Sequence, residues 1–168
     1  MKKMNIDPAS IREIFISNTD YDHMGGLYDL LNQVPVAGVY VPATTGHVRN
    51  AAIVIYIKEH LYLFRNIFST GELRMGYHYE HSLLIKTKKG ITIIVGCSRV
   101  GVKPILDAAK FYGKPYALIG GLRNFDKFDL LKDLEIICPT HSTKYRSEIK
   151  ALYPKKFVEG GVGKVIKI

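Results

Sequence analysis

The fold is decided by residues 18–26, which read Asn18-Thr19-Asp20-Tyr21-Asp22-His23-Met24-Gly25-Gly26. This stretch follows a short apolar run at 14–17 and precedes a segment at 27–31 whose leucines have helical spacing. A strand therefore ends in a turn that places three carboxyl or imidazole groups close together. Oxygen and nitrogen donors crowded onto one loop suit a hard or borderline divalent cation. The pattern predicts a metal site where a strand meets a helix.

The loop resembles the signature of the metallo-β-lactamase superfamily, in which His-x-His-x-Asp-His is followed by Gly-Gly. Asp22, His23 and the glycine pair match that signature, whereas Asn18 and Asp20 stand where it has its two leading histidines. Two of the expected metal ligands are therefore changed in this chain.

The resemblance continues in three later segments: Gly96-Cys97-Ser98-Arg99-Val100-Gly101, Gly120-Gly121-Leu122-Arg123 and Pro139-Thr140-His141-Ser142-Thr143. They are similar to Gly-Cys-Ser-His-x-Gly, Gly-Gly-x-His and Pro-x-His-Cys-Thr of the branch related to dihydropterin ribofuranosyl-aminobenzene phosphate synthase. Arg99 and Arg123 replace histidines of these motifs, and His141 is kept. The order of the motifs along nearly the whole chain is the strongest part of the resemblance.

The resemblance implies two metal positions of unequal quality. The first would use Asn18, Asp20 and Arg99, which are degenerate ligand positions because asparagine is a poor ligand and guanidinium has no free lone pair. The second would use Asp22, His23 and His141, which are all present. Three protein ligands with one open position are typical of catalytic zinc sites, where a bound water becomes more acidic. Asp22 and Asp20 are then the catalytic candidates, with Asp20 orienting water or adding a fourth ligand.

Alternatives to a metal site remain open. Asp22 could cap the following helix, and the two histidines could belong to a hydrogen-bond network without metal. Arg99 and Arg123 could bind a phosphate or carboxylate in the old metal cleft, because guanidinium offers bidentate geometry to such anions. Arg99 could instead form an internal ion pair with Asp20 or Asp22. The cofactor is therefore one divalent metal (zinc, iron or manganese) or none.

The chain is expected to form one α/β domain over residues 1–168, a metallo-β-lactamase-like αββα sandwich. Apolar runs predict strands at 13–17, 36–41, 52–57, 60–65, 82–87, 91–96, 116–119, 135–138 and 164–168, with a hairpin joining 82–87 to 91–96. Helices are predicted at 25–33, 102–112, 126–133 and 144–152. Family members carry several strands before the metal loop, which lies near the start of this chain. We therefore expect an N-terminally shortened sheet, completed by a second copy or a partner chain, or alternatively a truncated or split gene product.

The amino-acid composition limits the kinds of molecule that the protein is expected to bind. The formal charge of +9 and the pI near 9.5 favour an anionic small molecule. Single-stranded nucleic acid is disfavoured because the tyrosines sit in apolar runs such as 55–57 and 61–63, which predicts core or sheet-face positions. The donors at 77–81 are interpreted as a surface loop without metal. Two cysteines, no secretory h-region and no long apolar run predict a cytoplasmic protein that does not enter a membrane.

These observations leave two functional hypotheses. One is a metal-dependent hydrolase with a single metal, acting on a phosphorylated or otherwise anionic small molecule. The other is a non-catalytic anion-binding or assembly subunit that keeps the fold and has lost the metal chemistry.

Overall fold

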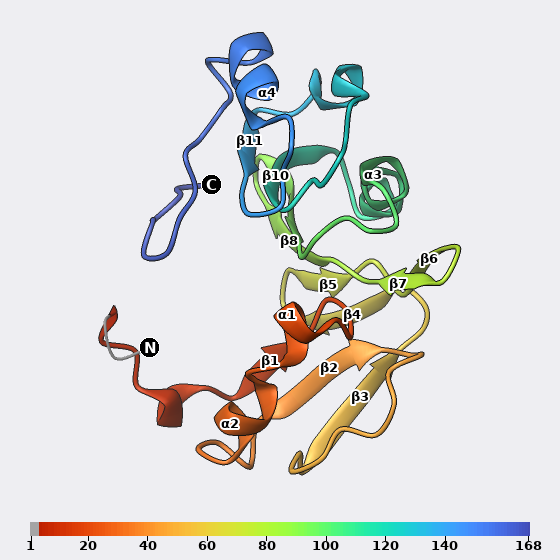
Figure 1. The fold of residues 1–168 in the computed structure, drawn as a ribbon, viewed down its shortest axis with the longest axis vertical. Helices are drawn as coiled ribbons and strands as arrows, with labels where there is room; N and C mark the ends of the chain where they lie inside the picture. The colour runs from red at the N-terminus through yellow and green to blue at the C-terminus, as the bar shows by residue number, and fades with distance from the viewer. Residues whose placement is uncertain (1–3) are drawn as a thin grey trace.

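The computed structural model describes residues 4–168 and contains two main sheets (Figure 1). The N-terminal sheet has the order β1-β2-β3, with strands β1 (Glu13–Phe15), β2 (Gly38–Pro42) and β3 (Ile53–Ile57). The C-terminal sheet has the order β11-β10-β9-β8-β5-β4, with strands β4 (Leu61–Phe64), β5 (Ile67–Ser69), β8 (Leu83–Thr87), β9 (Gly90–Val95), β10 (Pro115–Gly120) and β11 (Ile136–Pro139). A small hairpin pairs β6 (Leu73–Met75) with β7 (His78–Glu80).

Residues 4–168 also contain four α-helices and two 3₁₀ turns, which lie between or beside these strands along the chain. The helices are α1 (Tyr21–Met24), α2 (Leu27–Leu31), α3 (Val102–Lys110) and α4 (Arg146–Leu152). The 3₁₀ turns are η2 (Pro8–Ser10) and η3 (Phe128–Leu131). None of the helices in residues 4–168 is both long enough and apolar enough to cross a membrane.

The N-terminal sheet is parallel and owes its packing to side-chain alternation along β2. Val39 and Val41 are fully buried and form a cluster with Leu27 and Leu31 of α2. Tyr40, which lies between the two valines, points to the opposite face and contacts Phe64 of β4 at a ring-centroid distance of 5.8 Å. One face of the sheet therefore carries a helix, and the other faces the C-terminal sheet.

The C-terminal sheet holds the larger core. Ile91 and Ile93 of β9 are fully buried together with Ile105 and Ala109 of α3. These two helix positions are four residues apart and therefore lie on one face of α3. Leu118, Ile137 and Ile149 extend the same cluster across β10 and β11 to α4. The apolar runs that predict strands in this half thus pack as a sheet with helices against it.

The element boundaries agree with the predicted strands and helices for most of the chain. The hairpin of β8 and β9 is confirmed, with Thr87 paired to Gly90. The predicted strand at 164–168 is wrong, because no strand is present there, and the predicted helix at 126–133 is the short 3₁₀ turn η3. Tyr56 lies in β3 and Tyr62 in β4, where they are 47% and 61% exposed, so both occupy sheet-face rather than core positions.

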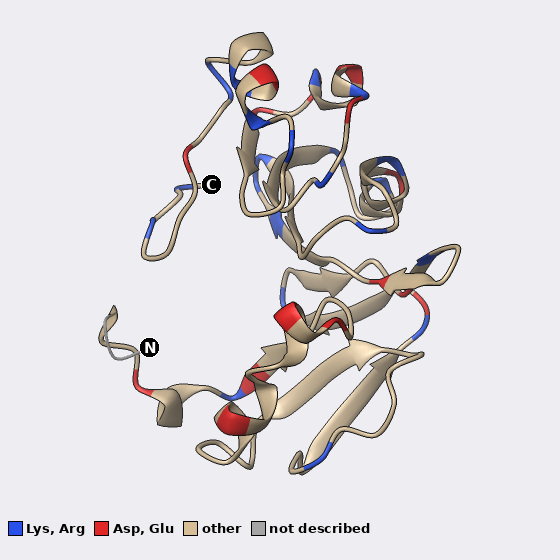
Figure 2. Ribbon diagram, in the orientation of Figure 1, with Lys and Arg blue, Asp and Glu red and all other residues tan. Residues whose placement is uncertain are grey.

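The positive charge is unevenly distributed. Residues 1–76 contain equal numbers of basic and acidic side chains, so the formal charge of +9 arises entirely in residues 77–168. Figure 2 shows the blue segments gathered around β8–β11, α3 and α4, whereas α1 and α2 carry acidic residues. An anion approaching the molecule is therefore attracted to its C-terminal half.

Candidate metal centre

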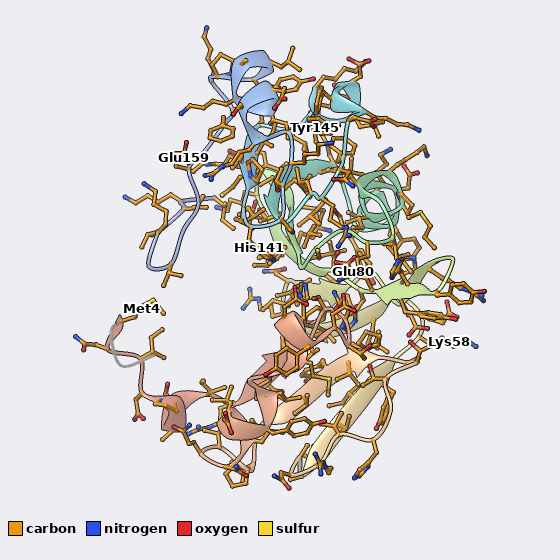
Figure 3. All side chains as sticks on the ribbon, in the orientation of Figure 1. Met4, Lys58, Glu80, His141, Tyr145 and Glu159 are labelled. Atoms are coloured by element: carbon orange, nitrogen blue, oxygen red, sulfur yellow. The ribbon has the colours of Figure 1, made fainter. Side chains whose placement is uncertain are left out.

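The four predicted motifs come together where the two sheets meet. They occupy the loops that follow β1, β9, β10 and β11, and the last three strands run parallel, so their carboxyl ends lie at one edge. Figure 3 shows His141 and Glu80 at the level of this junction. Ligand sites of open parallel sheets form at this edge, because the loops that leave it can surround a common space.

His23 is the most constrained of the candidate ligands. The short helix α1 carries it, and Ser17 Oγ lies 3.2 Å from its Nδ1 atom. Its Nε2 atom is buried and has no hydrogen-bond partner among the described residues. The nearest carboxylate oxygen, Asp22 Oδ2, is 3.6 Å away, and the ring of His141 lies at a centroid distance of 6.0 Å. An unpaired buried imidazole nitrogen close to a carboxylate is the arrangement expected of a ligand without its metal.

Two glycines make room for these histidines. A Cβ on Gly96 would overlap Ser17 Oγ and lie 3.2 Å from His23 Cε1. A Cβ on Gly121 would lie 2.9 Å from the carbonyl oxygen of His141. The motif glycines at the ends of β9 and β10 therefore allow the loops after β1 and β11 to approach closely.

Asp20, Asp22 and His23 offer ligand atoms that all lie within 4.8 Å of one another. Two carboxylates and an imidazole form a donor set suited to zinc, iron or manganese. Asp22 is also open to solvent, with 64% of its side chain exposed, so it is available to a bound ion. The cluster around His23 therefore has the donor types for one divalent cation, and His141, the third predicted ligand of the second position, lies outside this cluster.

The residues of the first metal position do not fit a cation. Arg99 forms an ion pair with Asp20 through Nε, which places a permanent positive charge where that metal would lie. The Oδ1 atom of Asn18 accepts a hydrogen bond from the Asp20 backbone at 3.0 Å, and so shapes the loop. The internal ion pair that was predicted as an alternative for Arg99 is therefore present.

Asp22 does not cap a helix, so that alternative is wrong. It lies inside α1, and the residue at the N-cap position is Asp20, whose side chain makes no capping hydrogen bond. His141 lies on an exposed loop, where its Nδ1 is 3.3 Å from Thr140 Oγ1. His23 and His141 are thus brought together from opposite ends of the sequence, as the motif order predicts.

Glu80 organises the arginine-bearing loop and was not predicted to do so. Its side chain is fully buried and accepts hydrogen bonds from the backbone N–H groups of Cys97, Ser98 and Arg99 at 2.9, 3.0 and 2.7 Å. Charge-assisted bonds of this kind are strong, so the loop after β9 is held rigidly. The interpretation of residues 77–81 as a surface loop is therefore wrong for most of the segment, because His78–Glu80 form β7 and both Glu80 and His81 are buried.

Arg99 and Arg123 both line one cavity. This cavity has a volume of about 260 Å³, and its lining includes Ser98, Arg99, Gly101, Leu122 and Arg123. Arg123 Nη1 also lies 3.5 Å from Cys97 Sγ. The N-terminus of α3 begins at the same wall, and no side chain caps it, so its free N–H groups add to the positive potential.

The loops after β9, β10 and β11 share one backbone feature. Each contains a non-glycine residue with positive φ: Ser98 (47°), Arg123 (48°) and Ser142 (57°). This conformation is unfavourable for L residues, so it persists only where surrounding contacts enforce it, and such positions concentrate at functional sites.

Comparison with known proteins bears on the fold and on the sequence motifs. No family model matches the chain. A 7,8-dihydropterin-6-methyl-4-(β-D-ribofuranosyl)-aminobenzene-5′-phosphate synthase of Methanocaldococcus jannaschii is 25% identical over 231 residues, covering 99% of this chain and 79% of the relative. The matched span exceeds the 168 residues of this chain, so the relative holds segments within it that have no counterpart here.

Two solved structures share the fold. Tm1679, a metal-dependent hydrolase of the β-lactamase superfamily, has a TM-score of 0.75 at 20% identity, covering 99% of this chain and 82% of its own. The metallo-β-lactamase fold protein YhfI of Bacillus subtilis has a TM-score of 0.68 at 11% identity, covering 95% and 78%. The predicted fold class and the predicted branch are thus both supported. The chain has the metallo-β-lactamase fold, and its sequence resembles the dihydropterin ribofuranosyl-aminobenzene phosphate synthase branch of that superfamily.

Proposed function

We propose that this protein is a hydrolase that uses a single divalent metal held by Asp22, His23 and His141, and that acts on a phosphorylated or otherwise anionic small molecule. The observation that carries the proposal is the buried, unpartnered Nε2 of His23, which lies 3.6 Å from Asp22 Oδ2, in a ring whose centroid is 6.0 Å from that of His141. A polar atom in that position costs free energy unless a ligand satisfies it. A divalent cation is the ligand that suits its neighbours.

When bound, the metal would act as a Lewis acid and lower the pKa of a coordinated water. The chain's own residues have separate roles in this proposal. Ser17 fixes the ring of His23 through Nδ1. Asp20, held by Arg99, presents a carboxylate beside the metal position and orients the attacking water. Arg99 and Arg123 bind the anionic group of the substrate in the cavity that they share.

The relatives support the choice of reaction and substrate. The structural relative Tm1679 is described as a metal-dependent hydrolase, and the sequence relative as the synthase of a 5′-phosphate. The positive charge of residues 77–168, which include both arginines, favours the same class of anionic substrate.

The test begins with metal content. Untagged protein prepared without chelators is reconstituted with Zn²⁺, Mn²⁺ or Fe²⁺ and analysed by mass spectrometry. We expect about one equivalent of metal, its loss in an Asp22→Asn/His141→Ala double variant, and its retention in His47→Ala, which changes an exposed histidine outside the motifs. Chromogenic phosphate mono- and diesters are then used to test whether the protein hydrolyses them only when the metal is bound. A protein that takes up no metal after reconstitution would refute the hydrolase.

The second candidate is a non-catalytic anion-binding subunit. The ion pair of Arg99 with Asp20 favours it, because this pair places a guanidinium where the first metal would lie and keeps the cleft positive without a Lewis acid. This candidate predicts binding of inorganic phosphate without metal. Isothermal titration should then show affinity that Arg123→Gln weakens and Asp22→Asn leaves unchanged. Phosphate binding only in the presence of metal would favour the hydrolase instead.

A further inference from the structure

Strand β4 is an open edge of the C-terminal sheet. In the described part of the chain it pairs with β5 alone, so its other side presents unpaired backbone N–H and C=O groups. Its residues are Leu61, Tyr62, Leu63 and Phe64, and three of them are exposed by 36%, 61% and 37% (Leu61, Tyr62 and Phe64). Apolar exposed edges of this kind are templates for pairing with another strand.

The usual protections of an edge strand are weak here. The four residues contain no proline, no lysine and no inward-pointing charge. The single irregularity is a register shift between Tyr62 and Phe64 in the pairing with β5. The apolar surface also continues beyond the strand, because His60 stacks on Phe111 at a centroid distance of 4.8 Å, and Phe111 is 73% exposed. A strand that joins this edge would therefore cover aromatic surface as well.

The sequence around β4 is chemically symmetric about Tyr62. Residues 59–65 read Glu59-His60-Leu61-Tyr62-Leu63-Phe64-Arg65, so a leucine, an aromatic ring and a charge follow Tyr62 in both directions. An antiparallel pair of identical strands related by a two-fold axis places residue i opposite its mirror position. Leu61 would then face Leu63 of the other copy, and His60 would face Phe64.

The charges at the two ends are opposite in sign. Glu59 lies in the bend before β4 and Arg65 in the turn after it, so Glu59 would lie near Arg65 of the second copy, and the same pair would occur again by symmetry. Both side chains are exposed, and within residues 4–168 neither forms an ion pair. Opposite charges directly across two antiparallel strands are favourable, whereas like charges there destabilise the pair. In the register centred on Tyr62, leucine therefore meets leucine, an aromatic ring meets an aromatic ring, and opposite charges lie near each other.

We propose that the β4 edge, defined as residues 59–65, is a homodimer interface at which the C-terminal sheets of two copies join antiparallel about a two-fold axis through Tyr62. The occupant is a second copy of this chain, because the segment complements itself. β5 and β8 separate β4 from β9, β10 and β11, and the loop after β11 carries the candidate ligand His141. No residue of the β4 edge is a candidate metal ligand, so the interface is independent of the proposed function.

The first test uses charge exchange. Sedimentation equilibrium of the full chain between 1 and 100 µM should give a dimer whose dissociation constant rises at least tenfold in Glu59→Arg and in Arg65→Glu. The double variant Glu59→Arg/Arg65→Glu should return to within about threefold of wild type, since it restores opposite charges across the axis. Circular dichroism checks that each variant folds. A monomeric wild type, or a double variant as weak as the single ones, would overturn the proposal.

The second test fixes the register. Cys97 and Cys138 are buried, so an exposed new cysteine reacts without competition from them. Tyr62→Cys would lie on the two-fold axis opposite its own copy and should form a disulfide-linked dimer under mild oxidation. Tyr77→Cys is the matched control, because Tyr77 is 96% exposed and lies in the turn between β6 and β7. Equal cross-linking of the two variants, or cross-linking of the control alone, would contradict the proposed register.

Discussion

At the scale of single residues, the most instructive side chain is His81, which is fully buried. Its Nε2 atom donates to the carbonyl oxygen of Ile16 at 2.7 Å, and its Nδ1 lies 3.1 Å from Ser69 Oγ. The ring also stacks on Phe15 of β1 at a centroid distance of 4.0 Å. His81 therefore joins the two sheets as a neutral imidazole, with the hydroxyl of Ser69 donating to Nδ1.

Burial lowers the pKa of His81 from its ordinary value of 6.5 to about 4. Between these two values the unfolded chain binds a proton that the folded chain does not, so stability falls as pH falls through this window. We predict that lowering the pH from 7 to 5 reduces the free energy of unfolding by about 2 kcal/mol through the protonation of His81 alone. Urea denaturation at a series of pH values measures this loss.

Two variants distinguish the contribution of His81 to the acid sensitivity from that of the carboxylates. In His81→Gln the slope of stability against pH between 6.5 and 5 should largely disappear, although the variant is less stable at every pH. His78→Gln, an exposed change three residues earlier, should keep the wild-type slope. An unchanged slope in His81→Gln would show that other groups cause the acid sensitivity.

Glu80 gives a second prediction at this scale. Glu80→Gln replaces one carboxylate oxygen by an NH₂ group, which then faces a backbone N–H of the loop after β9. We expect a loss of about 1–3 kcal/mol of unfolding free energy, because one buried donor loses its acceptor. Chemical denaturation measures the loss, and hydrogen exchange should show faster exchange at Cys97, Ser98 and Arg99. Unchanged protection of these amides would contradict the assigned role.

The candidate ligands could be predicted from the sequence, whereas their supports could not. Asp22, His23 and His141 stand in motifs whose residue types and order carry the information. Glu80 has no such signal, because its partners are three backbone amides 17 to 19 residues away that become neighbours only when β7 meets the end of β9. The ion pair of Arg99 with Asp20 was one of two alternatives, and only the fold could decide between them.

At the scale of elements, the site depends on how closely the end of β9 approaches the loop after β1. A Cβ on Gly96 would overlap Ser17 Oγ, the atom that holds His23 Nδ1. We predict that Gly96→Ala weakens metal binding at least tenfold, as loss of a supporting contact to a ligand histidine typically does. Competition titration with a chromogenic chelator measures the affinity. Gly161→Ala is the control, since a Cβ there meets nothing within 4 Å, and its affinity should stay within twofold of wild type.

Strands and helices were predictable where one physical signal dominated. The hairpin of β8 and β9 combines two apolar runs with a glycine turn, and α3 begins with a proline in its first turn and ends before Gly113. The apolar residues at 164–168 resemble a strand, but in the structure they pair with none, which shows that local propensity needs a partner. The short strands β5, β6 and β7 have three residues each, too few for alternation to be recognised.

At the scale of the whole molecule, the two sheets have separate cores. The cluster around α2 and β2 and the cluster around α3 and β9 share no residue. The sheets meet through a few contacts, such as the stack of Phe15 on His81 and the pair of Tyr40 with Phe64. The candidate metal centre is a further connection, because His23 belongs to the N-terminal half and His141 to the C-terminal half. The motif order already indicated that His23 and His141 come together. That they follow strands of two different sheets could be seen only from the strand topology.

A metal bound at Asp22, His23 and His141 should therefore stabilise the molecule as a whole. Binding to the folded state alone adds about 2.7 kcal/mol at a hundredfold excess over Kd. For a chain of 168 residues this corresponds to a rise in Tm of about 5–10 °C. Differential scanning calorimetry across a Zn²⁺ titration, with Mn²⁺ and Mg²⁺ as comparisons, measures this rise.

Single ligand variants decide whether the metal joins the halves. His141→Ala leaves Asp20, Asp22 and His23 as one local cluster on the loop after β1 and α1. If His141 completes the site across the sheet junction, this variant should lose most of the rise in Tm while its metal-free Tm stays near that of the wild type, because His141 is exposed. A full rise in His141→Ala would place the ion on the N-terminal cluster alone. The metal would then stabilise one loop and leave the junction of the two sheets to its aromatic contacts.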